Sequence, residues 1–253
     1  MQRKKLRRKS KSAVVYTPAA VLLILFLSVF GVSAFLKVVE IEVTGALMYT
    51  DDEIISASGI LAGDSLLLLK KSSASQKIQS AMPYISDVSL EVRLPNKVTI
   101  NVTEATAIAA IGHGDSVIVL DSAGRVLERT DVMPPELIEI IGVLPADTAE
   151  GSLLKTDAGS EPRLRHMREV LAAIEREGIA GSISYLNVSN ISNISFGYLE
   201  LYTVVLGSSD NARYKLSSLP EIIAEIEDAA TVPNETGTII MSDREPWRWS
   251  PTR

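Results

Sequence analysis

The sequence predicts an α+β protein that one N-terminal helix holds in a membrane. Three observations carry this prediction. A basic N-terminus precedes a long apolar stretch, strand and helix periodicities alternate after it, and the 253 residues include no cysteine. These features indicate a basic tail, a membrane anchor and two small folded domains without disulfides.

Residues 1–11 form the basic tail, and residues 12–36 are predicted to form a transmembrane helix. The tail holds seven Lys and Arg and no acidic residue, and no charged side chain follows until Lys37. At about 1.5 Å per residue, such a helix exceeds the ~30 Å hydrocarbon core of a bilayer. Because basic flanks stay in the cytoplasm, we expect Lys37 and all later residues outside it. A cleaved signal peptide is the alternative, since Val32-Ser33-Ala34 resembles a cleavage site, although signal peptides have shorter apolar segments.

The part of the chain after the tail is strongly acidic. The whole chain has 25 Lys and Arg against 31 Asp and Glu, and without the tail the balance is 18 against 31, a formal net charge of −13. Domains that bind nucleic acid display a basic patch, so this charge argues against a nucleic-acid partner. The lack of cysteine excludes disulfides, thiolate catalysis and cysteine-bound zinc.

The first folded elements after the anchor are a strand and a short helix. Residues 38–43 alternate between apolar and polar side chains, which predicts a half-buried strand. Thr50 and Glu53 have the spacing of a capping box, in which each side chain accepts a hydrogen bond from the backbone N–H of the other. The helix that they begin is expected to end at Gly59.

A second helix and two strands complete this first domain. Ser73 begins a second capping pair, Ser-x-x-Gln, and the helix is expected to end before Pro83. Residues 88–92 and 98–102 then alternate with a period of two, as half-buried strands do. The order strand, helix, helix, strand, strand over residues 37–104 predicts a compact module with both helices on one face of a three-stranded sheet.

Residues 105–245 are interpreted as a second, mixed α/β domain with an open, largely antiparallel sheet. A helix is expected over 160–177, and its buried face consists of Leu164, Met167, Leu171 and Ile174. A second helix is expected over 212–229, with a kink or a split at Pro220. Residues 246–253 remain as a C-terminal tail.

The anchor and the module after it resemble a known family. Residues 93–104 have the sequence RLPNKVTINVTE and close the strand–helix–helix–strand–strand order. This combination is similar to the POTRA domain of the FtsQ/DivIB family of bacterial cell-division proteins. The similarity continues through the second domain, in residues 117–127, 137–142, 204–216 and 238–242, and in the Trp-Ser-Pro ending at 249–251.

The resemblance implies a non-catalytic scaffold of the divisome. Such a protein sits in the cytoplasmic membrane at the division septum, with its N-terminus in the cytoplasm and its two domains outside. It binds single-pass partners of the FtsB (DivIC) and FtsL type and helps to regulate septal peptidoglycan synthesis, without a cofactor. By position, the family's partner-binding region corresponds to Arg213, Tyr214, Lys215, Ile239, Ile240, Met241 and Ser242.

Physical reasoning also favours the C-terminal region as a docking site. The segment Ile239–Ser242 is expected to be the last strand and to lie at an edge of the sheet, where unpaired N–H and C=O groups accept a partner strand. Trp247 and Trp249 are further candidates, because exposed tryptophans are frequent hot spots of interfaces. The alternative is that this strand only completes the sheet and that both tryptophans pack onto it.

The sequence contains no recognisable catalytic, metal-binding or cofactor-binding motif. Its two histidines are His113, in a glycine-rich turn, and His166, in a predicted helix. Neither a Gly-x-Ser-x-Gly motif nor a phosphate-binding glycine loop occurs. Two alternative functions remain: an accessory protein of transport or secretion, since POTRA modules also precede outer-membrane barrels, and a membrane-anchored hydrolase that uses one of the histidines.

Overall fold

A computed structural model gives the structure of the protein and describes residues 21–24, 36–146, 148–229, 235–241 and 247–252. The predicted membrane helix at 12–36 lies outside the described residues except for the helical residues 21–24 and for Leu36. Within the described ranges, no helix is both long enough and apolar enough to cross a bilayer.

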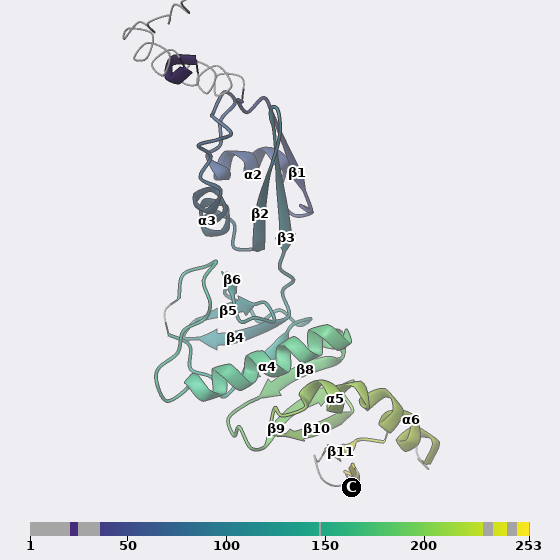
Figure 1. The fold of residues 1–253 in the computed structure, drawn as a ribbon. Helices are drawn as coiled ribbons and strands as arrows, with labels where there is room; N and C mark the ends of the chain where they lie inside the picture. Colours follow the sequence, from purple (N-terminus) through teal and green to yellow (C-terminus); the bar gives the residue numbers. More distant parts are fainter. Residues whose placement is uncertain (1–20, 25–35, 147, 230–234, 242–246, 253) are drawn as a thin grey trace, which may run out of the picture. The chain divides into compact units, whose positions relative to one another are not determined.

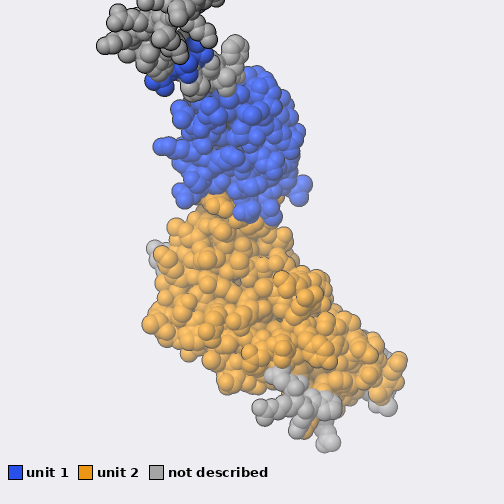
Figure 2. Space-filling model, in the orientation of Figure 1, with its two compact units in different colours: residues 1–78, 87–103 blue, residues 79–86, 104–253 orange. Residues whose placement is uncertain are grey.

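The chain divides into two compact units (Figure 2). Unit 1 consists of residues 1–78 and 87–103, and unit 2 consists of residues 79–86 and 104–253. The predicted C-terminal tail differs from the structure, because residues 248–251 form a strand.

The first sheet and its helices follow the predicted order (Figure 1). The elements are β1 (Glu40–Thr44), α2 (Asp51–Ser58), α3 (Lys71–Ala81), β2 (Ile85–Arg93) and β3 (Lys97–Glu104). The strand order is β1-β3-β2, and β1 runs parallel to β3. Ile54 of α2, Ile78 of α3 and Ile100 of β3 are completely buried, so the core lies between the helices and the sheet.

The two helices of this module differ in how well their starts were predicted. Thr50 caps α2 as expected: its N–H donates to the Glu53 carboxylate over 2.9 Å, and its hydroxyl accepts from the Glu53 N–H over 3.4 Å. Gly59 ends α2 with a φ of 67°. The expected cap at Ser73 is wrong, because α3 already begins at Lys71 and Ser73 lies in its first turn.

Unit 2 is built on one nine-stranded sheet with helices on one face (Figure 1). Its strands are β4 (Ala109–His113), β5 (Ser116–Leu120), β6 (Val126–Thr130), β7 (Ile138–Ile141), β8 (Ile183–Asn187), β9 (Ile194–Tyr198), β10 (Tyr202–Gly207), β11 (Gly237–Ile240) and β12 (Arg248–Pro251). Its helices are α4 (Glu161–Glu177), a single 3-10 turn (Ala180–Ser182), α5 (Ala212–Ser217) and α6 (Leu219–Ala229).

The strand order in this sheet is β12-β11-β10-β9-β8-β7-β4-β5-β6, and most neighbouring strands are antiparallel. The parallel neighbours are β4 with β7, β7 with β8, and β10 with β11. Parallel neighbours need a long crossover, which α4 supplies between β7 and β8, and α5 with α6 supplies between β10 and β11.

The helices of unit 2 pack as the sequence predicts. All four residues of the predicted apolar face of α4 are buried: Leu164, Met167, Leu171 and Ile174. The expected interruption near Pro220 is also present, since α5 ends at Ser217 and α6 begins at Leu219. Proline has no N–H and restricts the residue before it, so it fits the first turn of a new helix better than the interior of a continuous one.

Candidate partner-binding edge

The two edges of the nine-stranded sheet differ in their surroundings. At the β6 edge, the loop of residues 148–156 runs alongside the strand: the Val126 N–H donates to Ser152 over 2.9 Å, and the Gly151 N–H donates to Val126 over 2.8 Å. Arg129 reaches the same loop through a 2.8 Å hydrogen bond to the Thr148 carbonyl. Among the described residues, no strand pairs with the outer side of β12. The loop thus pairs with the start of β6, whereas β12 is a terminal strand of the sheet, the kind of edge that can accept another strand.

The strand predicted to lie at this edge is one position further in. β11 pairs with β10 on one side and with β12 on the other, so the prediction that Ile239–Ser242 forms an edge strand is wrong. The sequence interpretation missed β12 because this strand has only four residues and ends in proline. The signal that it did contain is the alternation of Trp247 and Trp249 with the polar Arg248 and Ser250.

The register of β12 determines which of its backbone groups face outward. The Thr252 N–H donates to the Thr236 carbonyl over 2.8 Å, and Thr238 lies opposite Ser250. In an antiparallel ladder, every second pair exchanges hydrogen bonds, so the N–H and C=O of Ser250 point toward β11. The corresponding groups of Trp249 and the carbonyl of Pro251 point to the outer side. The N–H that Pro251 lacks falls on this open side, as is usual for proline in edge strands.

The side chain of Trp249 lies on the core face of the sheet. Trp249 is opposite the fully buried Ile239, which in turn is beside the fully buried Val204 of β10. The indole meets the Tyr202 ring edge-on, with 5.6 Å between centroids and an interplanar angle of 70°. A Cβ on Gly237 would collide with the indole, so the absence of a side chain there provides the room that the ring occupies.

The prediction that both tryptophans are exposed is therefore wrong. Trp247 and Trp249 are both half-buried and pack against the core of unit 2. Their rings cover the end of the core at the β12 edge. Burial also raises the pKa of the neighbouring Tyr202 phenol, and the carboxylates of Glu227 and Glu235 act in the same direction.

The other predicted partner-binding residues include both buried and exposed side chains. Ile239, Met241 and Lys215 are buried, and the Lys215 ammonium donates to the carbonyls of Leu206 and Ser208 over 2.9 and 3.3 Å. Side chains in such positions act through packing, because a partner cannot reach them. Tyr214 and Ile240 are exposed.

Two predicted partner-binding residues remain to be described. Arg213 is exposed and forms a 3.1 Å ion pair with Glu177 of α4. Ser242 lies outside the described residues.

The two histidines occupy structural positions. His113 ends β4 at the hairpin to β5. The His166 Nδ1 lies 2.6 Å from the Ser209 hydroxyl, which donates to the Glu169 carboxylate over 2.5 Å. A catalytic serine needs a histidine that bridges it to the carboxylate through its two ring nitrogens. Here His166 Nδ1 and Glu169 both bind the same hydroxyl, so the cluster joins α4 to the loop after β10.

Comparison with known proteins gives a consistent result. The family model described as "POTRA domain, FtsQ-type" matches residues 36–105. The chain is 24% identical to the cell division protein DivIB of Clostridium tetani, over 77% of this chain and 72% of the relative. It is 26% identical to the cell division protein FtsQ of Corynebacterium glutamicum, over 79% of this chain and 86% of the relative.

One more relative and one solved structure are also similar to the chain. DivIB of Clostridium botulinum strain Hall is 26% identical over 88% of this chain and 86% of its own. The solved major extracytoplasmic domain of DivIB from Geobacillus stearothermophilus covers 51% of this chain and 99% of its own, with 16% identity and a TM-score of 0.32.

Proposed function

Because the chain belongs to the FtsQ/DivIB family of cell division proteins, we propose that it is a non-catalytic, membrane-anchored scaffold that binds another division protein through the β12 edge. The partner is a single-pass protein of the FtsB (DivIC) or FtsL type, and binding helps to control septal peptidoglycan synthesis. The open edge of β12, opposite a β6 edge that a loop covers, is the observation that carries this proposal.

Strand addition at β12 has a defined register. A partner strand can exchange two hydrogen bonds with Trp249, but at Pro251 it finds only a carbonyl, because proline has no N–H. The ladder therefore weakens toward the C-terminus, and the partner has to extend past the Trp247 end of β12 to gain further pairing. Its inward side chains would lie beside the indole of Trp249 and continue the core of unit 2.

The second face of β12 adds specificity. Arg248 and Ser250 are exposed on the side away from the core, and the exposed Ile240 lies opposite Arg248. A partner strand that places polar side chains opposite Arg248 and Ser250 forms polar pairs at the rim of the interface. Such rim pairs contribute more to the choice of partner and to the association rate than to affinity.

Disulfide mapping tests this proposal directly, because the chain has no cysteine of its own. Ser250→Cys and Arg248→Cys variants of the full chain are co-expressed with a partner that carries one cysteine at successive positions. Pairing with β12 predicts that the introduced thiols at positions 250 and 248 each cross-link to one partner position, and that a single residue separates these two partner positions. The control is Leu47→Cys, at an exposed residue of unit 1. A partner that co-purifies with the chain without cross-linking to either β12 variant would refute the site.

The cellular role has its own measurement. A fluorescent fusion of the chain should collect at mid-cell, and depletion should give filaments that grow without dividing. A fusion spread evenly over the membrane, in cells that divide normally after depletion, would contradict a role as a division scaffold.

A further inference from the structure

The point where the chain enters unit 1 lies between two loops. On one side, the Leu66 N–H donates to Leu36 over 3.0 Å, and the Val38 N–H donates to Asp64 over 2.8 Å. On the other side, the Val39 N–H donates to Asn96, in the turn between β2 and β3, over 2.8 Å. Residues 36–39 are thus fixed between the loop of residues 61–69 and the turn of residues 94–96.

Both loops carry exposed aliphatic side chains. We call the following set the apolar end of unit 1, and each of its members is more than half exposed: Val39, Leu61, Leu67, Leu68 and Leu94. Single exposed leucines are ordinary on protein surfaces, but a group of them at one end of a small domain marks an interaction surface. The hydrogen bonds of residues 36–39 bring these two loops to the same end of the sheet.

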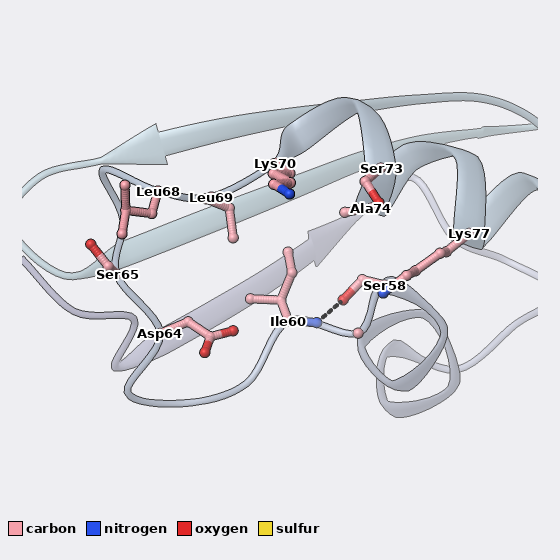
Figure 3. Close-up of a pocket in the computed structure, with 11 residues that line it drawn as sticks. Ser58, Ile60, Asp64, Ser65, Leu68, Leu69, Lys70, Ser73, Ala74 and Lys77 are labelled. Carbon is pink, nitrogen blue, oxygen red and sulfur yellow. Dashed lines mark hydrogen bonds between the residues drawn. The ribbon is translucent and has the colours of Figure 1, made fainter.

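Positively charged side chains lie beside one of the two loops of this apolar end. Lys37 pairs with the loop at Ser65, and Lys70 and Lys71 follow the exposed leucines directly. A surface hollow of about 390 Å³ lies beside the loop (Figure 3). Lys70 and Lys77 line it, together with one acidic residue, Asp64, whose carboxylate already accepts the Leu61 N–H over 2.9 Å. Lys70 and Lys71 therefore place positive charge beside the exposed leucines of this loop, on a chain whose formal charge outside the tail is negative.

The position of this surface along the chain identifies what covers it. Residues 12–36 contain no charged side chain, and Lys37 is the first charged residue after them. A chain that leaves a bilayer near Leu36 enters unit 1 between the two leucine-bearing loops, with no linker residues to spare. Exposed leucines with lysines beside them match the interface of a membrane with anionic lipids, where aliphatic groups enter the acyl boundary and ammonium groups meet phosphates.

We propose that the apolar end of unit 1 rests in the outer surface of the membrane, with Leu67 and Leu68 inserted among the lipid headgroups. The phosphates of anionic lipids lie against Lys70, Lys71 and the hollow that Lys77 lines. This contact fixes the direction in which unit 1 leaves the membrane. It depends on the predicted anchor and on no protein partner.

The test uses the full chain, reconstituted in vesicles of phosphatidylethanolamine and phosphatidylglycerol. Leu68→Cys and Leu47→Cys variants are labelled with an environment-sensitive fluorophore. Leu47 is a matched control because it is also a leucine, 93% exposed against 79% for Leu68, and it follows the far end of β1. We expect the probe at position 68 to shift its emission to the blue and to lose most of its intensity to nitroxide-labelled lipids, while the probe at position 47 keeps the emission seen in water.

Equal emission and equal quenching at the two positions would overturn the proposal. So would a blue shift at position 68 that occurs only when a partner protein is added, since a protein would then cover the surface. Circular dichroism of each labelled variant confirms that unit 1 is folded, and a third probe at Leu94→Cys repeats the measurement from the second loop. Flotation of the vesicles reports separately whether the chain is anchored at all.

Discussion

Replacing Trp249 by alanine and by proline separates the two ways in which this residue can bind a partner strand. Trp249→Ala removes the indole and keeps the outward N–H, whereas Trp249→Pro removes both. Proline is compatible with this position because the N–H of Trp249 does not pair with β11. The two variants therefore differ in one backbone hydrogen-bond donor on the open edge.

The size of each effect follows from the structure. The indole is already half-buried in the free chain, so a partner covers only its remainder, and we expect Trp249→Ala to weaken binding by about 1–2 kcal/mol, or roughly five- to thirtyfold in Kd. The missing donor in Trp249→Pro adds about 1 kcal/mol, or about a further fivefold. Losing half of a packed tryptophan also lowers the free energy of unfolding of both variants by about 2 kcal/mol.

The assay is the affinity of the full chain, in lipid nanodiscs, for the extracytoplasmic part of the partner. Circular dichroism confirms that both variants are folded, and Ser250→Pro serves as the contrasting control, because its N–H points toward β11 and its loss opens the β11–β12 ladder within the chain. Equal affinities of Trp249→Ala and Trp249→Pro would refute pairing of the partner with this edge.

Three further predictions concern residues around the two cores. Gly237→Ala should lower the free energy of unfolding by about 1–3 kcal/mol in a thermal unfolding assay, because the new methyl group would collide with the Trp249 ring. Gly112→Ala is the control, and it should have little effect in the same assay because the space around Gly112 is open. Lys215→Met should lower the free energy of unfolding in urea by about 1–3 kcal/mol, because two backbone carbonyls lose their hydrogen-bond donor. The same variant should bind the partner with unchanged affinity. Unchanged stability together with weaker partner binding would instead make Lys215 a contact residue. Hydrogen bonds from the backbone and hydroxyl of Thr50 hold the pKa of Glu53 below its ordinary value of 4.5, so this pair stabilises the fold above that pH and less as pH falls through the lowered pKa. The stability difference between the wild type and Thr50→Ala should accordingly shrink in acid, and a constant difference would contradict this account.

Local interactions explain which parts of the fold could be predicted from the sequence. The capping box of α2 needs only Thr50 and Glu53, three residues apart, and the structure contains both of its hydrogen bonds. The break between α5 and α6 follows from the covalent geometry of one residue, Pro220. The apolar face of α4 is set by helical periodicity, and its four predicted core residues are all buried.

The edge of the sheet could not be predicted in this way, because it depends on contacts between distant segments. β11 lies beside β10 only through the crossover of α5 and α6, and nothing within residues 237–240 shows that a further strand follows. The half-buried state of Trp249 depends on Gly237, twelve residues earlier, which leaves space for the ring. Burial of Lys215 against two carbonyls is equally invisible in a sequence that suggests a surface cation.

The unequal edges of the nine-stranded sheet limit how many chains can join. A sheet that is open at both ends can add copies of itself without limit, as fibrils do. Here residues 148–156 occupy one end, so two copies meeting through β12 would form a closed dimer and could grow no further. Self-pairing and partner binding would then compete for the same four-residue strand, and the local concentration of the chain would set the balance between them.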